Sequence, residues 1–193
     1  AITYPEYVNK IISISSSYKL STIQLLHNLE QAYILELAND SKSRKEEYLS
    51  LARMIAHKTY ISLDLLAARA RGESKYIDDE MGYFLKTPQE SYMMHQGEKF
   101  IERFTMDSYR TIINAWQNFK LDEKELKKLK GKEVLVLSVD SDVCFYPEEQ
   151  TELVNVLELN NASVSYFLLH SDKGHDAFLL EPDIFFEPVS SYL

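Results

Sequence analysis

The spacing of hydrophobic and polar positions changes twice along the chain and divides it into three parts. Residues 8–16 (VNKIISISS) form a short apolar run that is typical of a buried strand. From about residue 19 to residue 120, apolar side chains recur every three or four positions, as they do on helices. From residue 133 onward, short apolar runs alternate with a helical pattern. The pattern therefore predicts one strand, about five helices, and then strand, helix, strand and helix.

Capping and stop signals delimit the predicted helices. The strongest start is Thr87-Pro88-Gln89-Glu90, with an N-cap threonine, proline at the first helical position and glutamate at the third. This helix should run to about Arg103, and Gly72 stops an earlier one. We place the helices at about 21–37, 43–55, 62–71, 87–103 and 107–119, with a loop at 73–86; the helix 107–119 should bury Tyr109, Ile112, Ile113 and Trp116.

The C-terminal part predicts parallel α/β structure. Its elements are a charged helix or linker at 121–130, strands at 134–139 and 164–169, a helix at 148–159, a turn at 160–161, and a terminal helix from Asp183 that Pro188 breaks. Three parallel strands leave an apolar edge on the first, which aggregates unless something covers it. We therefore expect a fragment with a cut end at Ala1, which needs either its own missing N-terminal half or a second copy.

Two polar loops follow the two C-terminal strands. Asp140-Ser141-Asp142 comes directly after one strand, and His175 lies in the loop after the other. Ligands of doubly wound α/β proteins bind beyond the carboxyl ends of the strands. Strand, Asp, helix, strand and His is also the order of the last two members of the α/β-hydrolase triad. We interpret His175 as general base and acid, oriented by Asp142 or Asp140. Spacing alone does not choose between the two carboxylates, and a turn aspartate remains the alternative role for Asp142.

These loops resemble the C-terminal part of the homoserine O-acetyltransferase family, a branch of the α/β-hydrolases. The resemblance covers nearly the whole chain, and its run Gly174-His175-Asp176-Ala177-Phe178-Leu179 is specific. The other matching positions are LARMI (51–55), His57, Tyr60, ESY (90–92), QG (96–97), KF (99–100), RF (103–104), Ser141, Asp142, Phe145 and Pro147. The resemblance implies the C-terminal part of an α/β-hydrolase fold: a core strand at 1–18, a helical lid at 19–120, and the core with the Asp and His loops at 121–193.

The resemblance also implies residue roles. The family's Ser-Asp pair falls on Ser141-Asp142, which favours Asp142 as the residue that orients His175. Arg53 and Tyr60 fall on lid positions that approach the amino-acid substrate, and a guanidinium suits a carboxylate through two hydrogen bonds. Asp176 falls on the position that holds the substrate's ammonium group. The alternatives are a solvent-exposed helix face for Arg53 and Tyr60, and a local turn for Asp176.

The chain departs from the family pattern directly after Asp142. Val143 replaces a large residue, often Trp, Cys144 replaces Leu, and Tyr146 replaces a proline. These changes affect the packing of the pocket, and with it the substrate, more than the triad. Cys144 is close enough to Asp142 to be considered as a nucleophile, but its apolar family position favours a buried structural thiol.

Charge and composition exclude several classes of function. The net charge of −9 disfavours nucleic acid and anionic membranes as partners. No run approaches the roughly 20 apolar residues of a membrane helix. The single cysteine fits a reducing cytoplasm. His170, Asp172 and His175 are neighbours in sequence, but their spacing fits no zinc pattern, so we expect no metal and no bound cofactor.

The resemblance implies acetyl transfer from acetyl-CoA to the side-chain hydroxyl of L-homoserine, in methionine biosynthesis, by a Ser-His-Asp double displacement. No Gly-x-Ser-x-Gly sequence occurs in the chain, so we expect it to be inactive alone. The alternatives are a related O-acyltransferase or esterase of the same fold, with a succinyl donor or serine as acceptor, and a non-catalytic dimerisation module. The resemblance also implies a homodimer that pairs through the lid.

Overall fold

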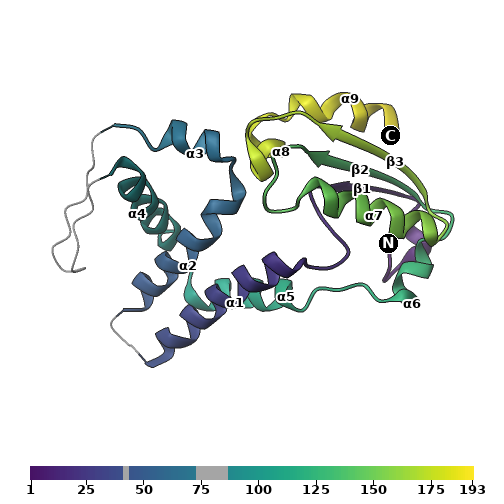
Figure 1. Ribbon diagram of the computed structural model, residues 1–193. Coiled ribbons are helices and arrows are strands. Elements are labelled where there is room, and N and C mark those ends of the chain that lie inside the picture. The colour runs from purple at the N-terminus through teal and green to yellow at the C-terminus, as the bar shows by residue number, and fades with distance from the viewer. Residues whose placement is uncertain (41–43, 73–86) are drawn as a thin grey trace. The chain divides into compact units, whose positions relative to one another are not determined.

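The computed structural model describes residues 1–40, 44–72 and 87–193; the predicted loop 73–86 lies outside the described residues. The chain packs into two units (Figure 1). We call Ala1–Ser21, Thr59–Ser62 and Phe119–Leu193 the sheet unit, and Thr22–Lys58 with Leu63–Asn118 the helical unit. The described α-helices are α1 (Thr22–Leu37), α2 (Lys45–Tyr60), α3 (Leu63–Arg69), α4 (Pro88–Ile101), α5 (Met106–Gln117), α6 (Glu123–Leu126), α7 (Pro147–Leu159), α8 (Ala177–Leu180) and α9 (Asp183–Tyr192).

The sheet unit is built on three parallel strands, β1 (Lys10–Ile14), β2 (Glu133–Val139) and β3 (Ser163–Leu169), in the order β1-β2-β3. This confirms the predicted strands and their parallel arrangement. The first strand is shorter than predicted because Ser15 has a φ of 43°, which ends the extended conformation. In the register, Val139 at the end of β2 pairs with Leu169 at the end of β3. The two loops that follow these strands therefore begin at the same level of the sheet.

Both faces of the sheet are covered, as a parallel sheet requires (Figure 1). On one face, Val134 and Val136 pack with Leu153 and Leu157 of α7. The other face of β2 packs against Phe185 of α9 through Leu135, Leu137 and Val139. This alternation of successive side chains follows from the pleat of the strand. The 121–130 segment is only partly solvated, since Leu126 and Leu129 are buried in the α7-side cluster.

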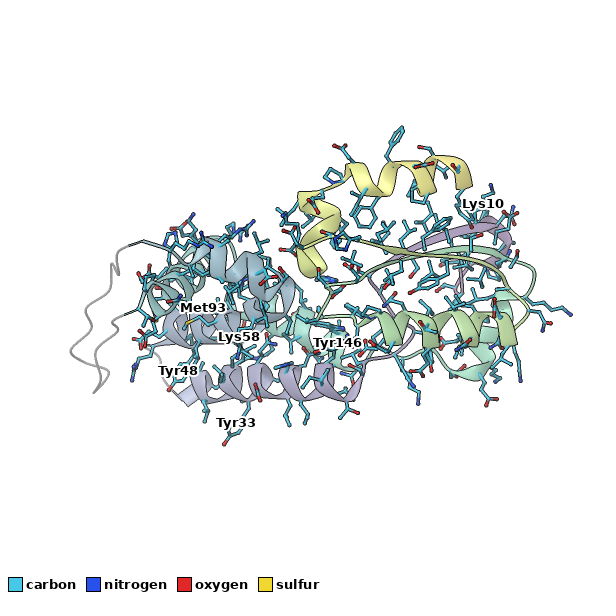
Figure 2. The ribbon with its side chains drawn as sticks, turned by 45° about the horizontal axis from the view of Figure 1, so that its top comes forward. Lys10, Tyr33, Tyr48, Lys58, Met93 and Tyr146 are labelled. Carbon is cyan, nitrogen blue, oxygen red and sulfur yellow. The ribbon has the colours of Figure 1, made fainter. Side chains whose placement is uncertain are left out.

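The prediction that Pro188 breaks the terminal helix is wrong. α9 continues through Pro188 from Asp183 to Tyr192. The proline lies in the middle of a helix that packs against the sheet through Phe185, so tertiary packing retains a helix that local propensity disfavours. At the end of α9, Lys10 donates to the carbonyl oxygen of Tyr192 at 2.7 Å; Lys10 is labelled in Figure 2. This bond ties the C-terminal helix to the start of β1.

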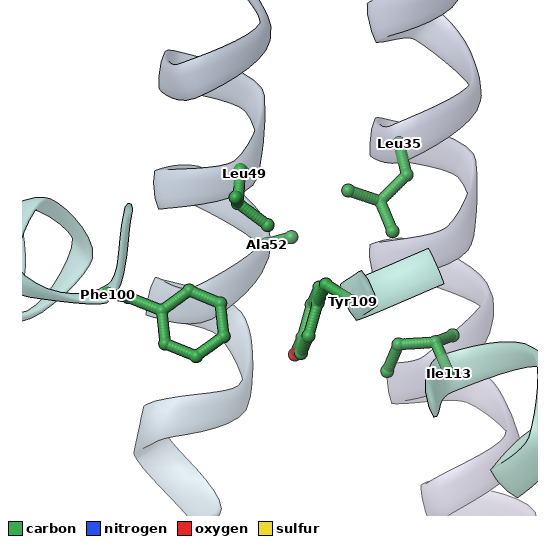
Figure 3. Packing of buried hydrophobic residues seen from close by; sticks show 6 residues of the cluster. All are labelled: Leu35, Leu49, Ala52, Phe100, Tyr109 and Ile113. Carbon is green, nitrogen blue, oxygen red and sulfur yellow. The ribbon is translucent and has the colours of Figure 1, made fainter. Parts of the chain in front are cut away.

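The helical unit has its own core, shown in Figure 3. The cluster joins four helices, α1, α2, α4 and α5, through Leu35, Leu49, Ala52, Phe100, Tyr109 and Ile113. The Thr87 capping box at the start of α4 is present as predicted, with both reciprocal bonds formed. The prediction for α5 is correct for Tyr109 and Ile113, and Trp116 packs against the cluster. Ile112 is wrong: its side chain is 49% exposed.

Helix α1 has an unusual distribution of polarity. Three polar side chains on it are buried, namely Gln24, Asn28 and Gln31. The apolar residues at helical spacing are exposed, namely Leu26, Leu29, Tyr33 and Leu37. Figure 2 shows Tyr33 pointing away from its helix. The buried polar face is partly satisfied within the unit, because the Tyr109 hydroxyl donates to the Gln31 amide oxygen. None of the helices in the described residues has the length and apolarity needed to cross a bilayer.

Candidate active site

Asp142 is fixed by hydrogen bonds to both of its carboxylate oxygens. Its Oδ1 accepts the backbone N–H groups of Cys144 and Phe145, each at 2.8 Å. Its Oδ2 lies 3.0 Å from Nδ1 of His175. The side chain is 0% exposed. Oδ1 of Asp142 thus stabilises the turn that follows the strand, and Oδ2 contacts the histidine, so one carboxylate combines the two alternative roles.

His175 is held in one orientation by Asp142. An ionised carboxylate can only accept a hydrogen bond, so we assign the ring hydrogen to Nδ1. In the neutral ring, Nε2 is then the basic nitrogen. Among the described residues, no group hydrogen-bonds Nε2, and the side chain is 17% exposed. This arrangement is typical of a general base: a carboxylate orients the ring through Nδ1, and Nε2 is left to accept a proton.

Three aromatic rings surround the imidazole of His175. Phe145 is stacked on it, with ring centroids 5.4 Å apart, and Phe178 meets it edge-on at 5.6 Å. Tyr60, at the end of α2, lies 6.3 Å away. Thr59–Ser62 belongs to the sheet unit, so the structure brings together Tyr60 and the His175 loop within one packed body. The rings restrict rotation of the imidazole and exclude water from its sides.

Gly174 lets the His175 loop approach the Ile61–Ser62 backbone closely. Its φ is +74°, a conformation that costs a non-glycine residue about 1–2 kcal/mol. A Cβ at this position would lie 2.5 Å from the Ser62 backbone nitrogen. The Ser62 backbone N–H and hydroxyl donate to the carbonyl oxygens of Lys173 and Asp172. The glycine is therefore required both by the backbone and by the contact.

Asp140, the competing carboxylate, has a different partner. Its Oδ2 lies 2.5 Å from Nδ1 of His170, and its Oδ1 accepts the Ser171 N–H at 3.1 Å. Desolvation raises the pKa of Asp140, but these hydrogen bonds outweigh it, so the pKa of Asp140 is lowered overall. The hydrogen bond that His170 donates to Asp140 raises the pKa of this histidine, whose side chain is 92% exposed. The strand ends thus hold two Asp–His pairs, and the buried one contains Asp142 and His175.

Cys144 and Asp176 flank this pair. Burial, and then the charge of Asp142, raise the pKa of the Cys144 thiol to about 12, which disfavours the nucleophilic thiolate. The structure therefore contradicts Cys144 as a nucleophile. Asp176 is half-buried in the 3₁₀ turn Gly174–Asp176, next to His175. His170, Asp172 and His175 do not converge: no group of three or more His, Cys, Asp or Glu in the described ranges has the arrangement of a metal site.

Arg53 lies in the helical unit, on α2, where it meets His57. Its Nη2 is 3.4 Å from His57 Nδ1, and its guanidinium lies over the ring of Phe100, 5.1 Å from the centroid. His57 Nε2 is 3.2 Å from the Tyr92 hydroxyl of α4. Burial, together with the charges of Arg53 and Arg69, lowers the pKa of His57 from 6.5 to about 4. A neutral His57 can accept from Arg53 through Nδ1 and donate to Tyr92 through Nε2, so it orients the guanidinium.

Sequence reasoning missed several parts of this arrangement. Phe145 and Phe178 matched the family pattern, but the pattern gave no indication that both rings contact the imidazole. The bond between His57 and Tyr92 joins positions 35 residues apart, and no local spacing signals it.

Comparison with known proteins identifies relatives of nearly the whole chain. No family model matches it. Homoserine O-acetyltransferase of Methanosalsum zhilinae is 34% identical over 94% of this chain and 39% of its own length. A protein of Neisseria gonorrhoeae named homoserine O-succinyltransferase is 31% identical over 100% of this chain and 55% of its own length. The chain thus spans from 39% to 55% of the length of these curated relatives.

Solved structures match the fold. Homoserine O-acetyltransferase from Bacillus anthracis superposes with a TM-score of 0.84 at 15% identity, over 99% of this chain and 54% of that one. Esterase E22 superposes with a TM-score of 0.83 at 13% identity, over 98% of this chain and 55% of that one. At these identities the likeness shows the fold alone. That fold is the α/β-hydrolase fold.

Proposed function

We propose that this chain, which belongs to the homoserine O-acetyltransferase family of the α/β-hydrolases, supplies the acid–base pair and part of the amino-acid site of an acyltransferase. The reaction that we propose is acetyl transfer from acetyl-CoA to the side-chain hydroxyl of L-homoserine, in methionine biosynthesis. The serine nucleophile and the oxyanion donors of this reaction would come from outside the 193 residues. Our prediction that the chain alone does not turn over rests on the same point.

One observation supports this proposal above the others: the buried Asp142 carboxylate holds His175 by Nδ1 and leaves Nε2 as the basic nitrogen. In the proposed reaction, Nε2 takes the proton of the serine hydroxyl as the serine attacks the thioester. The proton then passes to the departing CoA thiolate. In the second half, Nε2 takes the proton of the homoserine hydroxyl as it attacks the acyl-serine, and returns that proton to the serine oxygen.

We propose that Arg53 binds the substrate carboxylate, with Tyr60 beside His175 and Asp176 as the group that faces the substrate ammonium. The His57 hydrogen bond supports the role of Arg53, because it fixes the orientation of the guanidinium. Tyr60 is supported by its position against the imidazole ring. Asp176 is supported by its place next to His175 in the same 3₁₀ turn.

Succinyl-CoA is the second candidate donor, because one relative bears the name homoserine O-succinyltransferase. A simple esterase of the same fold is the other alternative, since esterase E22 shares the architecture. The three candidates use the same acid–base pair. They differ in the acyl donor, which is a CoA thioester or a plain ester, and in whether homoserine or water accepts the acyl group.

The test is an assay of the full-length protein with acetyl-CoA or succinyl-CoA, with and without L-homoserine, and separately with p-nitrophenyl acetate. Thiol release and mass spectrometry of O-acylhomoserine distinguish the two CoA donors. Thiol release without homoserine identifies hydrolysis of the thioester, and release of p-nitrophenol without any acyl transfer to homoserine identifies the esterase. We expect O-acetylhomoserine, and a loss of about 10⁴-fold in kcat for Asp142→Asn, with a comparable loss for His175→Ala. The matched control is His170→Ala, which removes the exposed histidine of the second Asp–His pair and should leave the rate unchanged. Equal losses in His170→Ala and His175→Ala would contradict the assignment.

We also propose that the helical unit is the lid of the enzyme and that two copies pair through it. The exposed apolar stripe of α1, formed by Leu26, Leu29, Tyr33 and Leu37, supports this proposal. Such a stripe is the kind of surface that protein–protein contacts cover. A dimer would also explain why α1 directs its polar side chains inward.

A further inference from the structure

We propose that Ser141 is a positioning residue for His175, acting through the loop that precedes the histidine. This inference rests on the proposed function, because it assigns Ser141 a part in the acid–base step. Ser141 lies between Asp140 and Asp142 at the end of β2, where both neighbours contact a histidine. Its own hydroxyl contacts neither imidazole. It contacts the backbone of the loop that links them.

The hydroxyl of Ser141 closes the loop 171–174 from within. It donates to the carbonyl oxygen of Ser171 at 2.5 Å and accepts the backbone N–H of Gly174 at 3.0 Å. These are the two ends of a four-residue turn, and His175 follows directly. One hydroxyl thus uses its donor and an acceptor lone pair to hold both ends. Any change in this turn moves the backbone of His175 relative to Asp142.

The other contacts of the loop hold its earlier residues. Asp140 accepts the Ser171 N–H at 3.1 Å and ties the first residue of the turn to the end of β2. The Ser171 hydroxyl accepts the Lys173 N–H at 3.1 Å and donates to Glu181 at 2.5 Å, so it orders the loop toward α8 and α9 but does not connect it to β2. Ser62 holds the carbonyl oxygens of Asp172 and Lys173 on the other side. Among the residues that the structure describes, only Ser141 ties the Gly174 N–H, directly before the histidine, to the strand end that precedes Asp142.

The hydroxyl therefore holds the backbone directly before His175 against the end of β2, in addition to the register of the two strands. A shift of about 1 Å in a reacting group can cost about 10²-fold in rate. In Ser141→Ala, the Gly174 N–H and the Ser171 carbonyl lose their partner, and the turn is free to relax. We expect kcat to fall by between about 10-fold and 100-fold. KM should stay within about twofold, since Ser141 contacts no substrate group in the proposal.

The experiment compares three serine variants of the full-length protein in the acyl-transfer assay. Ser141→Ala should lower kcat, and Ser141→Thr, which keeps the hydroxyl, should recover most of it. Ser138→Ala is the matched control: it makes the same substitution three residues earlier, on β2, at a fully buried hydroxyl that has no hydrogen-bond partner among the described residues. It should leave kcat unchanged.

A second readout separates positioning from a general loss of structure. The Nδ1–H of His175, bonded to Asp142, should give a low-field proton NMR signal that His175→Ala removes. We expect this signal to be broadened or lost in Ser141→Ala and retained in Ser138→Ala. An active wild-type protein whose Ser141→Ala variant keeps both kcat and the low-field signal overturns the inference. A wild-type protein without acyl transfer, but with the signal lost in Ser141→Ala, overturns the proposed function and leaves the positioning contact standing.

Discussion

The close approach at Gly174 allows one prediction to be developed with an internal reference. Gly174 and Gly131 have almost the same backbone conformation, with φ of +74° and +73°. A Cβ at Gly131 would meet nothing within 4 Å, whereas at Gly174 it would lie 2.5 Å from the Ser62 nitrogen and 2.8 Å from the Ile61 carbonyl carbon. The contacting atoms are backbone, so they cannot move as a flexible side chain would. The pair of sites therefore separates backbone strain from steric overlap.

The expected magnitudes follow from this difference. Each alanine incurs about 1–2 kcal/mol for the left-handed conformation. Alanine also reduces the conformational entropy of the unfolded chain, which favours the folded state. This effect is the same for both substitutions and cancels when they are compared. Overpacking adds typically about 1–3 kcal/mol at Gly174 alone. We expect Gly131→Ala to lower the free energy of unfolding by about 1 kcal/mol, and Gly174→Ala by about 3 kcal/mol.

Urea unfolding of the full-length protein, followed by circular dichroism, measures the free energy of unfolding of both variants, with the same m-value applied to each. The acyl-transfer assay is the second measurement, because only Gly174 adjoins His175. If the loop relieves the overlap by moving, the stability difference shrinks but the loss of kcat appears in Gly174→Ala and not in Gly131→Ala. Equal unfolding midpoints together with equal activities would refute the reasoning.

Two further predictions concern the helical unit. The pKa of His57 is 6.5 as an ordinary histidine in the unfolded chain and about 4 in the folded chain. Below pH 6.5 the unfolded chain therefore binds a proton that the folded chain does not. The stability that His57 contributes is fully present above pH 6.5 and is lost as the pH falls from 6.5 toward 4. His57→Gln should flatten the pH dependence of the urea midpoint over that range. His95→Gln, at an exposed position of α4, is the control and should leave this pH dependence unchanged. If the wild-type protein and both variants show the same pH dependence, His57 is not its source. For the proposed dimer, Leu29→Lys combined with Tyr33→Lys should shift sedimentation equilibrium of the full-length protein toward monomer, because both side chains lie on the exposed stripe. Leu159→Lys, which replaces an exposed leucine on α7, is the control, and a dimer that survives the double substitution would show that α1 is not the interface.

The sequence was sufficient where one physical rule decided the outcome. The apolar run Val134–Leu137 in β2 favoured a buried strand, and the Thr87 capping box satisfied the first turn of α4 by local bonds alone. It failed where tertiary packing decided. Nothing local shows that Pro188 lies in a helix that packs through Phe185, or that the stripe of Leu26, Leu29, Tyr33 and Leu37 on α1 faces outward.

The candidate site shows the same division. Strand ends and loop order predicted where a carboxylate and a histidine would stand, because parallel strands end at one edge of the sheet. Spacing could not choose between Asp140 and Asp142, since both reach across to the β3 loop and each finds a histidine there. The choice depends on burial: Asp142 is enclosed and its partner half-enclosed, while the partner of Asp140 is in solvent. Burial is a property of the folded chain, so the sequence alone could not supply it.

The pairing of Val139 with Leu169 has a consequence for how this site could be assembled. The separation of Asp142 and His175 is fixed by two hydrogen-bonded neighbours in a sheet, and not by the chain that runs between them. A break at the turn between α7 and β3, where Asn161 is exposed, would leave the hydrogen bonds of Asp142 and His175 intact. Two separately produced polypeptides that meet in the same strand register should therefore rebuild the pair. By this reasoning, the register of β2 and β3 preserves the separation of Asp142 and His175, and a continuous chain between the two residues is not required.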